Sequence, residues 1–319
     1  MPNTPEETDF RDRVCLPMLA AAQNSDGGWG YQKGKQSATE PTAWALLALH
    51  SSANSSDFSL AIQRSKDWLR GVQLPDRSWP AFPELLQGCW LTSLSCLALN
   101  QYGESADAVA GGAQWLCNEW PGDSKLWRRV VQQLFAKRNL VRQNQALRGW
   151  SWTPGTSSWV EPTAFALILL HELTASKTLR PVGEKRRKLA EAMLYDRMCP
   201  GGGWNSGNSA VYGVAGEPLV GPTVWALIAL QKYRERAENQ ASLEWLLSTR
   251  EGIEGPGSLA LAHICFQVYG YAVPPIVPAL RQDFEKNQFL GSTLVAAACA
   301  VALEAPAGWL SWEKAAAFQ

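Results

Sequence analysis

Hydrophobic and polar residues alternate along this chain in segments that are each about as long as a helix. Six segments are apolar on almost every face, and most of them follow a turn rich in Gly, Pro or Trp. They are Ser37–His50, Gly88–Leu99, Trp159–Leu173, Pro218–Gln231, Gly257–Gly270 and Gly291–Leu303. A helix with apolar residues on all sides is normally surrounded by other protein. The pattern therefore predicts six buried helices.

More polar segments with helical periodicity lie between the apolar ones. They are Asp9–Asn24, Phe58–Val72, Ala106–Glu119, Glu184–Met198, Asn239–Thr249 and Pro275–Lys286. Self-similarity with this period is typical of stacked helix pairs that cannot bury their apolar faces alone. We therefore predict an all-α fold, an (α/α)6 barrel or toroid of six inner and six outer helices. A single domain over residues 1–319 is expected, with a cavity surrounded by the inner-helix ends.

One stretch, Trp150–Leu173, combines three tryptophans with a single acid at the start of an apolar helix. Pro162 suits the first helical position, and Glu161 then lies just outside the helix N-terminus, where the helix dipole favours negative charge. The indoles of Trp152 and Trp159 would desolvate this carboxyl, raise its pKa and stabilise a developing cation. Glu161 is therefore the candidate acid.

Glu40 holds the equivalent position in the segment Ser37–His50. A repeated acid can equally be a structural charge on the helix dipole, so both interpretations stay open for Glu40 and Glu161. His50 and His171 each follow their glutamate by ten residues and are interpreted as structural groups near helix C-termini.

Charge and cysteine usage narrow the class of protein. The 319 residues include 29 basic and 29 acidic residues, and this balance argues against a nucleic-acid partner. Seven scattered cysteines, mostly in apolar segments, indicate reduced thiols of a cytoplasmic protein. The polar start, Met1–Arg13, does not predict a signal peptide. No apolar run reaches the roughly 18 residues of a membrane span.

Two long intervals interrupt the repeat. An insert at about 121–148 contains Ser124–Arg148, in which seven basic residues occur without an acid. It is either a solvated helical face or a contact for a diphosphate or an anionic membrane surface. The other interval, Cys199–Gly221, is rich in Gly, Ser and Asn.

The motifs QNSDGGWGY at 23–31, CPGGGWNSG at 199–207 and EPTAWALLAL at 40–49 carry a resemblance. They resemble the prenyltransferase/squalene-oxidase repeat of squalene-hopene cyclases and related class II terpene cyclases, over roughly residues 15–305. Those enzymes carry a D-x-D-D-T-A motif whose middle Asp protonates an alkene or epoxide, and the resemblance implies a corresponding motif here. This chain has WVEPTA at 159–164, so Glu161 matches the middle Asp, while Trp159 and Pro162 replace the flanking acids.

The same toroid is similar to the β subunit of protein prenyltransferases, which hold zinc through an Asp, a Cys and a His. Cys89 and His263 stand in segments similar to two of those ligand segments, but Gln87 stands where the Asp is expected. Catalytic zinc usually needs three protein ligands, so we predict no metal and no other cofactor. Cys89 and His263 are interpreted as core residues rather than as metal ligands.

The predicted ligand is an isoprenoid or another hydrophobic small molecule, with a peripheral membrane contact left open and the oligomeric state not specified. Most tryptophans should brace turns, and a minority should line the cavity. The candidate substrate-binding residues are Trp152, Trp159, Glu40, Trp44, Cys89, Trp90, Phe165, Trp204, Tyr212, Trp225 and His263.

Four functions remain open. The first is a terpene-cyclase-like enzyme in which Glu161 starts a carbocation cyclisation. The second is a non-catalytic isoprenoid- or lipid-binding toroid. A protein prenyltransferase-like subunit and a carbohydrate-active α/α barrel are further alternatives, the latter lacking a convincing pair of acids.

Overall fold

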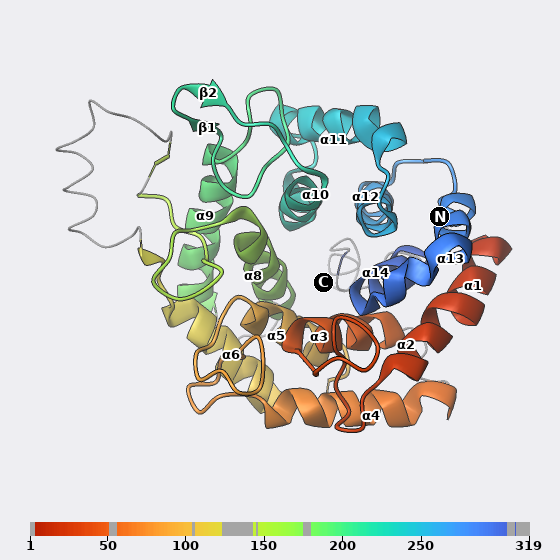
Figure 1. The fold of residues 1–319 in the computed structure, drawn as a ribbon. Coiled ribbons are helices and arrows are strands. Elements are labelled where there is room, and N and C mark those ends of the chain that lie inside the picture. The colour runs from red at the N-terminus through yellow and green to blue at the C-terminus, as the bar shows by residue number, and fades with distance from the viewer. Residues whose placement is uncertain are drawn as a thin grey trace, which may run out of the picture. The chain divides into compact units, whose positions relative to one another are not determined.

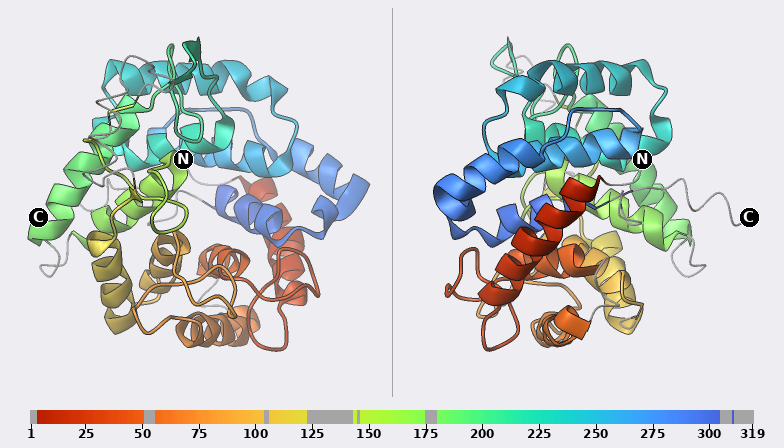
Figure 2. Two further views of the ribbon diagram at one scale, coloured as in Figure 1. Left: turned by 60° about the vertical axis from the view of Figure 1, so that its left-hand side comes forward. Right: turned by 90° about the vertical axis from the view of Figure 1, so that its right-hand side faces the viewer.

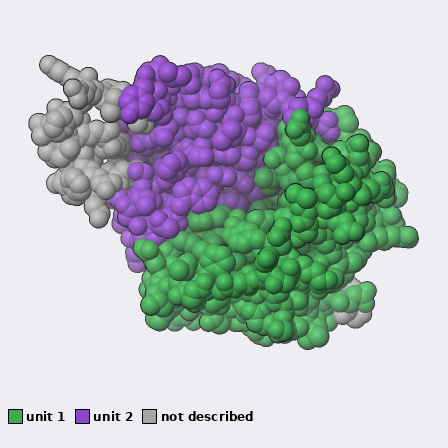
Figure 3. Space-filling view, viewed as in Figure 1, with its two compact units in different colours: residues 1–112, 253–319 green, residues 113–252 purple. Residues whose placement is uncertain are grey.

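A computed structural model of the chain describes residues 4–50, 56–103, 106–122, 143–144, 146–174, 180–304 and 310. The chain divides into two compact units (Figure 3). Unit 1 comprises residues 1–112 and 253–319, and unit 2 comprises residues 113–252. Most of the predicted basic insert, residues 123–142 and 145, lies outside the described residues. Whether the chain forms a single domain therefore stays a prediction.

Unit 1 has a buried row of helices covered by more polar ones (Figure 1). The buried row is, in contact order, α12 (Pro256–Tyr269), α14 (Thr293–Ala302), α3 (Thr39–Leu49) and α5 (Leu91–Asn100). The other elements are α1 (Pro5–Phe10), η1 (Arg11–Cys15), α2 (Leu16–Ala22), α4 (Ser56–Gly71), α13 (Val277–Asn287) and η7 (Gln288–Gly291). Among these, α4 packs on α3, α2 on α14 and α1 on α13. The helix α6 (Ala106–Asn118) begins in unit 1 and ends in unit 2.

Unit 2 repeats the same two-layer plan. The apolar helices α8 (Val160–Leu173) and α10 (Val220–Ala229) pack against each other. The helix α9 (Arg180–Asp196) covers α8, and α11 (Ala237–Thr249) covers α10. Short helical turns η5 (Gln231–Tyr233) and η6 (Arg250–Gly252) follow α10 and α11. Within the described residues, the predicted six apolar and six more polar helical segments are all present.

A small β-hairpin in unit 2 was not predicted. Strands β1 (Ala210–Val211) and β2 (Val214–Ala215) pair antiparallel in the long Gly-rich interval. Tyr212 and Gly213 form its tip with positive φ angles of 52° and 77°. Each strand has only two residues, which is too few for an alternation of apolar and polar positions to be recognised in the sequence.

The first outer helix is continuous from Pro5 to Ala22, as Figure 2 shows in its right-hand view. A π-helical turn, η1, lies immediately before Pro17, where Leu16 N–H donates to Arg11 O. Because proline has no N–H and its ring crowds the preceding turn, the helix accommodates it by widening there. The helix thus accommodates Pro17 through a local π-turn.

A tryptophan brace joins each outer helix to the following inner helix in four repeats. The indole N–H donates to a carbonyl in the last turn of the preceding outer helix, and the tryptophan backbone N–H donates to a threonine hydroxyl in the next inner helix. The indole bonds are Trp29–Leu19 and Trp79–Leu69 at 2.8 Å, Trp150–Leu116 at 2.9 Å and Trp204–Leu194 at 2.6 Å. The threonine acceptors are Thr42, Thr92, Thr163 and Thr223, each at 2.9 Å. The brace fixes the start of each inner helix and therefore the residues beside it.

The predicted start of α8 needs a small correction. Val160 begins the helix after Trp159, which is extended at φ −126° and ψ 157°. Glu161 is therefore the second helical residue rather than a residue outside the helix, and Pro162 is the third. The proline is tolerated because first-turn N–H groups have no partner within a helix.

All seven cysteines lie within the described residues, and each is buried and free of disulfides. In the part of the chain that the structure describes, no helix is both long and apolar enough to cross a bilayer.

Candidate functional site

The two candidate acids occupy the same place in two repeats, one in each unit. Glu40 is the second residue of α3 and Glu161 the second residue of α8. Thr42 and Thr163 follow two residues later. Each accepts a hydrogen bond from the backbone N–H of its brace tryptophan, which fixes both helix starts in the same way. The N-terminal end of a helix favours a negative charge, so this position suits a carboxyl group in either protonation state.

Glu40 has a phenol as its partner. The Tyr31 hydroxyl donates to Glu40 Oε2 at 2.7 Å. The loop brings the two together because Trp29 and Ala38 pair as an antiparallel bridge, which turns the chain back on itself. Burial raises the pKa of Glu40, while the hydrogen bond from Tyr31 acts in the opposite direction and only partly offsets it. The site therefore favours a protonated carboxyl more than water does.

Two neighbouring groups are also held in their protonated forms. Burial raises the pKa of the Cys89 thiol to about 11, assisted by the charge of Glu40 and opposed by a hydrogen bond from the Leu91 backbone. The Tyr31 phenol has a pKa raised first by burial and then by Glu40. Glu40, Tyr31 and Cys89 thus form a cluster in unit 1 in which burial shifts each group toward its protonated form.

Glu161 has different surroundings in unit 2. Its Oε1 points toward the first turn of α10, where a Cβ on Gly221 would lie 3.6 Å from it. Gly221 takes the glutamate's place in that repeat, before Pro222 and Thr223. Trp152 follows the brace Trp150 by two residues, as Tyr31 follows Trp29, so an indole stands where the Glu40 site has its phenol.

An aromatic residue recurs two positions after the braced threonine in three repeats: Trp44, Phe165 and Trp225. All three are nearly buried. In unit 2 the rings of Phe165 and Trp225 lie 4.5 Å apart, so adjacent inner helices present a joint aromatic surface. In the repeat of α5, Trp90 occupies the position that corresponds to Glu40, directly before the helix and directly after Cys89.

Three other candidates lie away from these acids. Trp204 is fully buried in a brace, where its indole bonds to α9. Tyr212 is at the hairpin tip and is 73% exposed, because a two-residue turn leaves its central side chains in solvent. His263 faces α1, with Nε2 3.9 Å from Glu7 Oε1. Trp204 thus packs in the interior, Tyr212 lies on the surface and His263 faces a carboxylate. The sequence pattern could not distinguish these positions from positions that line a cavity.

Trp159 lines a groove of about 340 Å³ in unit 2, beneath the hairpin. Its polar wall includes Asn205 and Asn208. The Asn205 side chain is committed to its own loop, because it accepts from Gly207 N–H and Asn208 N–H and donates to Asn208 O. The Asn205 amide is therefore used mainly to hold its own loop rather than to face a ligand.

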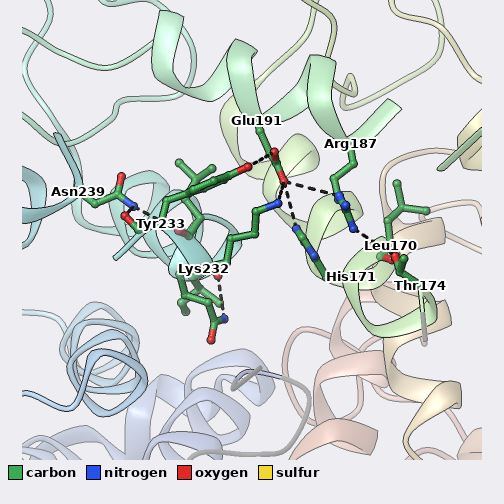
Figure 4. A network of polar contacts seen from close by, with 11 residues as sticks. Leu170, His171, Thr174, Arg187, Glu191, Lys232, Tyr233 and Asn239 are labelled. Atoms are coloured by element: carbon green, nitrogen blue, oxygen red, sulfur yellow. Dashed lines mark hydrogen bonds and ion pairs between the residues drawn. The ribbon is translucent and has the colours of Figure 1, made fainter. Parts of the chain in front are cut away.

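A buried charge network occupies the other end of α8 (Figure 4). Tyr233 Oη donates to Glu191 Oε2 at 2.7 Å, Lys232 Nζ lies 3.1 Å from Oε1, and His171 Nε2 lies 3.3 Å from Oε1. Burial alone would raise the pKa of Glu191, but its hydrogen bonds from His171, Tyr233 and Lys232 outweigh burial and lower it to about 2. His171 thus pairs with α9 instead of capping carbonyls, while His50 Nε2 does contact a carbonyl, Gln101 O, at 3.1 Å.

Among the described residues, no group of three or more His, Cys, Asp or Glu side chains is placed to hold a metal ion. Burial raises the pKa of both Cys89 and Cys265, which disfavours the thiolate that a metal requires. The absence of a cofactor stays a prediction.

Tyr31 is the functional candidate that the sequence analysis missed. The available signal was its position, two residues after a brace tryptophan and nine before Glu40. A regular repeat would have suggested that this position lies beside the glutamate.

No protein-family model matches the chain. An uncharacterised protein of Sinorhizobium fredii (strain NBRC 101917 / NGR234), y4kT, is 35% identical over 82 residues. That match spans 24% of this chain and 15% of the relative's length.

Solved structures resemble the chain over nearly its whole length. An α-amylase from Clostridium perfringens aligns at TM-score 0.61 with 10% identity, covering 95% of this chain and 99% of that chain. Rex8A from Paenibacillus barcinonensis (L320A mutant, complexed with xylose) aligns at TM-score 0.55 with 9% identity, covering 94% and 93%. These likenesses confirm the predicted all-α, (α/α)6-barrel fold class, and at such identities they show the fold alone.

The type II terpene cyclase MstE from Scytonema also aligns, with 13% identity over 93% of this chain and 98% of that chain. Its TM-score is 0.38, so this likeness carries no argument about activity.

Proposed function

We propose that the protein is a terpene-cyclase-like enzyme that binds a linear isoprenoid and starts its cyclisation with a proton from a first-turn glutamic acid. The observation that supports this function is the environment of Glu40, where burial raises the pKa and the Tyr31 phenol lies 2.7 Å from Oε2. A general acid must hold its proton at the working pH and must be stabilised as an anion after giving it up. Burial favours the protonated carboxyl, and the hydrogen bond from the Tyr31 phenol stabilises the anion.

Glu40 is the proposed donor, on geometric grounds. Glu161, which the resemblance to the cyclase motif favours, is the alternative donor at the equivalent place in unit 2. Neither carboxyl has the flanking acids of that motif, so an epoxide, which is easier to protonate than an isolated alkene, is the proposed reactive group. Glu40 would protonate the epoxide oxygen, the C–O bond would break, and an alkene of the same molecule would attack the carbon.

The reaction closes as an isomerisation. The cyclic cation would lose a proton from carbon, and solvent would return a proton to the glutamate, so no co-reactant is consumed. The indole face of Trp44, which lies two positions after the braced Thr42 on the helix of Glu40, would stabilise positive charge near the acid. A pKa near 11 keeps Cys89 as a thiol, which is a much weaker trap for a carbocation than a thiolate would be.

The test is conversion of oxidosqualene into isomeric cyclic alcohols by the purified protein in detergent, followed by gas chromatography with mass detection. Glu40→Gln keeps shape and hydrogen bonding but removes the acid, so turnover should fall at least about a hundredfold. Glu161→Gln is the matched variant at the equivalent repeat position and should retain turnover. Loss in Glu161→Gln alone would transfer the proton donor to Glu161.

A non-catalytic isoprenoid-binding protein is the competing function. Saturable binding of oxidosqualene without any product, unchanged in both glutamine variants, would establish it and would contradict the enzyme proposal.

A further inference from the structure

The start of α3, next to Glu40, is tied to the loop of the following repeat. Thr39 N–H donates to Ala81 O at 3.0 Å, and the Thr39 hydroxyl donates to Pro80 O at 2.6 Å. Thr39 is 0% exposed, so water does not compete for these two bonds. One residue therefore fixes residues 80 and 81 relative to the backbone that carries Glu40.

The next residue of that loop, Phe82, lies against the phenol that faces Glu40. The rings of Phe82 and Tyr31 lie 6.4 Å apart at an angle of 53°, which is within the usual range for an aromatic pair. Tyr31 is 38% exposed, so without this contact its ring would be free to take other rotamers. The contacts thus form a closed set, whose members are Glu40, Thr39, residues 80–82 and Tyr31.

A second link ties the same two loops together at the surface. Gln36 Nε2 donates to Glu84 Oε2 at 2.8 Å. Because both side chains are exposed, water competes for this bond and its net contribution is small. The buried hydroxyl of Thr39 is therefore the side-chain link that we expect to hold the loop in place.

Glu161 in unit 2 lacks the hydroxyl of this set of contacts. Val160 corresponds to Thr39 and makes the same backbone bond, from its N–H to Ser206 O at 3.0 Å. Because valine has no hydroxyl, the second bond cannot form. This position therefore contributes one hydrogen bond to the loop instead of two.

The phenyl ring and the phenol are also absent beside the acid of unit 2. Gly207 occupies the place of Phe82, and Trp152 occupies that of Tyr31. The hydroxyl, the phenyl ring and the phenol therefore occur together beside one acid, and all three are missing beside the other. This co-occurrence is expected if the three groups act on Glu40 as a unit.

We propose that Thr39 is a positioning residue for the Tyr31–Glu40 pair. Its hydroxyl holds residues 80–82 in place, Phe82 then confines the Tyr31 ring, and the phenol stays directed at the Glu40 carboxyl. This inference rests on the proposed function only in taking Glu40 as the proton donor. The geometry that it concerns can be measured in a protein that converts no substrate.

The pKa of Glu40 reports whether the phenol is in place. The hydrogen bond from Tyr31 lowers that pKa against the effect of burial, so a displaced phenol should raise it. Tyr31 and Cys89, which lie beside Glu40, have pKa values raised by burial, so neither titrates together with the glutamate. Carbon NMR of labelled glutamate in the full chain, assigned by comparison with Glu40→Gln, follows this titration.

Thr39→Val keeps the side-chain shape and the backbone bond to Ala81 O but removes the bond to Pro80 O. The pKa of Glu40 should rise, and Thr39→Ser, which keeps a hydroxyl, should hold it near the wild-type value. Thr293→Val is the matched control. Thr293 begins α14 as Thr39 begins α3 and is buried, but its hydroxyl has no hydrogen-bond partner among the described residues. This variant should leave the pKa of Glu40 unchanged.

A double-mutant cycle tests whether Thr39 acts through the phenol. In a Tyr31→Phe background the carboxyl has already lost its hydrogen bond, so Thr39→Val should cause no further rise in the pKa of Glu40. An unchanged pKa in Thr39→Val alone, or an equal rise with and without the phenol, would overturn the proposal. Should Thr39→Val fail to fold, Phe82→Leu, at a half-buried ring, decides by the same two criteria.

Turnover separates this inference from the proposed function. If oxidosqualene is converted, Thr39→Val should lower kcat about three- to tenfold, the effect of one hydrogen bond, and leave KM unchanged. A raised KM at unchanged kcat would contradict a positioning role. A wild-type protein that converts no oxidosqualene would count against the proposed function, and the pKa measurements would still decide the role of Thr39.

Discussion

At the scale of single residues, the site depends on what faces each repeated glutamate. Glu40 and Glu161 have the same place in their helices, yet Tyr31 faces the first, while Trp152 holds the corresponding loop position for the second. A hydrogen bond donated to a carboxylate stabilises the anion. The face of an indole carries partial negative charge and does not stabilise a neighbouring anion. The two glutamates therefore differ in the residue that lies two positions after their brace tryptophan, Tyr31 for Glu40 and Trp152 for Glu161.

Removing the phenol beside Glu40 provides the first prediction. Tyr31→Phe takes away the one group that lowers the pKa of Glu40 against burial, so that pKa should rise further. Turnover should fall about tenfold to a hundredfold, because the glutamate formed by proton transfer loses a charge-assisted hydrogen bond. Tyr212→Phe, at the exposed hairpin tip, is the matched control and should change neither quantity. A Tyr31→Phe enzyme with an unchanged pH profile would exclude this role of the phenol.

The sequence singled out both glutamates as candidates but did not predict what surrounds each of them. The repeat EPT identified Glu40 and Glu161 together, and the cyclase motif then favoured Glu161. The only sequence signal for the pairing of Tyr31 with Glu40 was the position of Tyr31 in the repeat, and the hydrogen bond itself depends on the turn that bridges Trp29 to Ala38.

At the scale of elements, the brace defines the repeat. Each brace tryptophan uses both its indole and its backbone N–H, so one residue joins two helices. The spacing from tryptophan to threonine is 13 residues in three repeats and 19 in the fourth, where the hairpin is inserted. The brace thus tolerates a long insertion without moving the helix start.

The brace gives the second prediction. Thr92→Val preserves the side-chain shape but leaves the buried Trp79 N–H without its acceptor. The free energy of unfolding should fall by about 1–3 kcal/mol, the cost of an unsatisfied buried donor. Chemical denaturation followed by tryptophan fluorescence measures it. The control is Thr153→Val, on an exposed turn, and an equal loss in both variants would refute the brace's contribution.

The charge network between α8, α9 and the turn after α10 gives the third prediction. Glu191→Gln leaves Lys232 and its neighbours without their shared anion, which should cost about 3 kcal/mol of unfolding free energy at neutral pH. Glu184→Gln, on the exposed face of the same helix, should cause no resolvable change.

The pH dependence of that loss follows from the lowered pKa of Glu191. Its folded pKa is about 2 against a usual value of 4.5, so its stabilisation is fully present above pH 4.5 and is lost as the pH falls toward 2. The stability difference between wild type and Glu191→Gln should therefore shrink from pH 5 to pH 3. A difference that stays constant or grows over this range would contradict the network's ionised state.

At the scale of the whole molecule, hydrophobic patterning was sufficient for the fold class. The six apolar segments and their more polar partners correspond to the helices of the structure within a few residues, because full burial and helical periodicity leave a strong signal. The hairpin of unit 2 and the left-handed turn η7 were missed, since both depend on local backbone geometry rather than periodicity. Both lie where the chain departs from the regular brace.

The same fold class occurs in an α-amylase and in a xylose-binding protein, so fold alone does not select a reaction. The proposed function depends on whether the Glu40 carboxyl keeps its proton in the folded protein. Resonance assignment of its side-chain carboxyl carbon by comparison with Glu40→Gln, followed by an NMR titration of labelled glutamate, measures this directly. We predict a pKa clearly above 4.5 for Glu40, falling back toward 4.5 on unfolding. A pKa at or below 4.5 in the folded protein would contradict the proposed role of Glu40 as the proton donor.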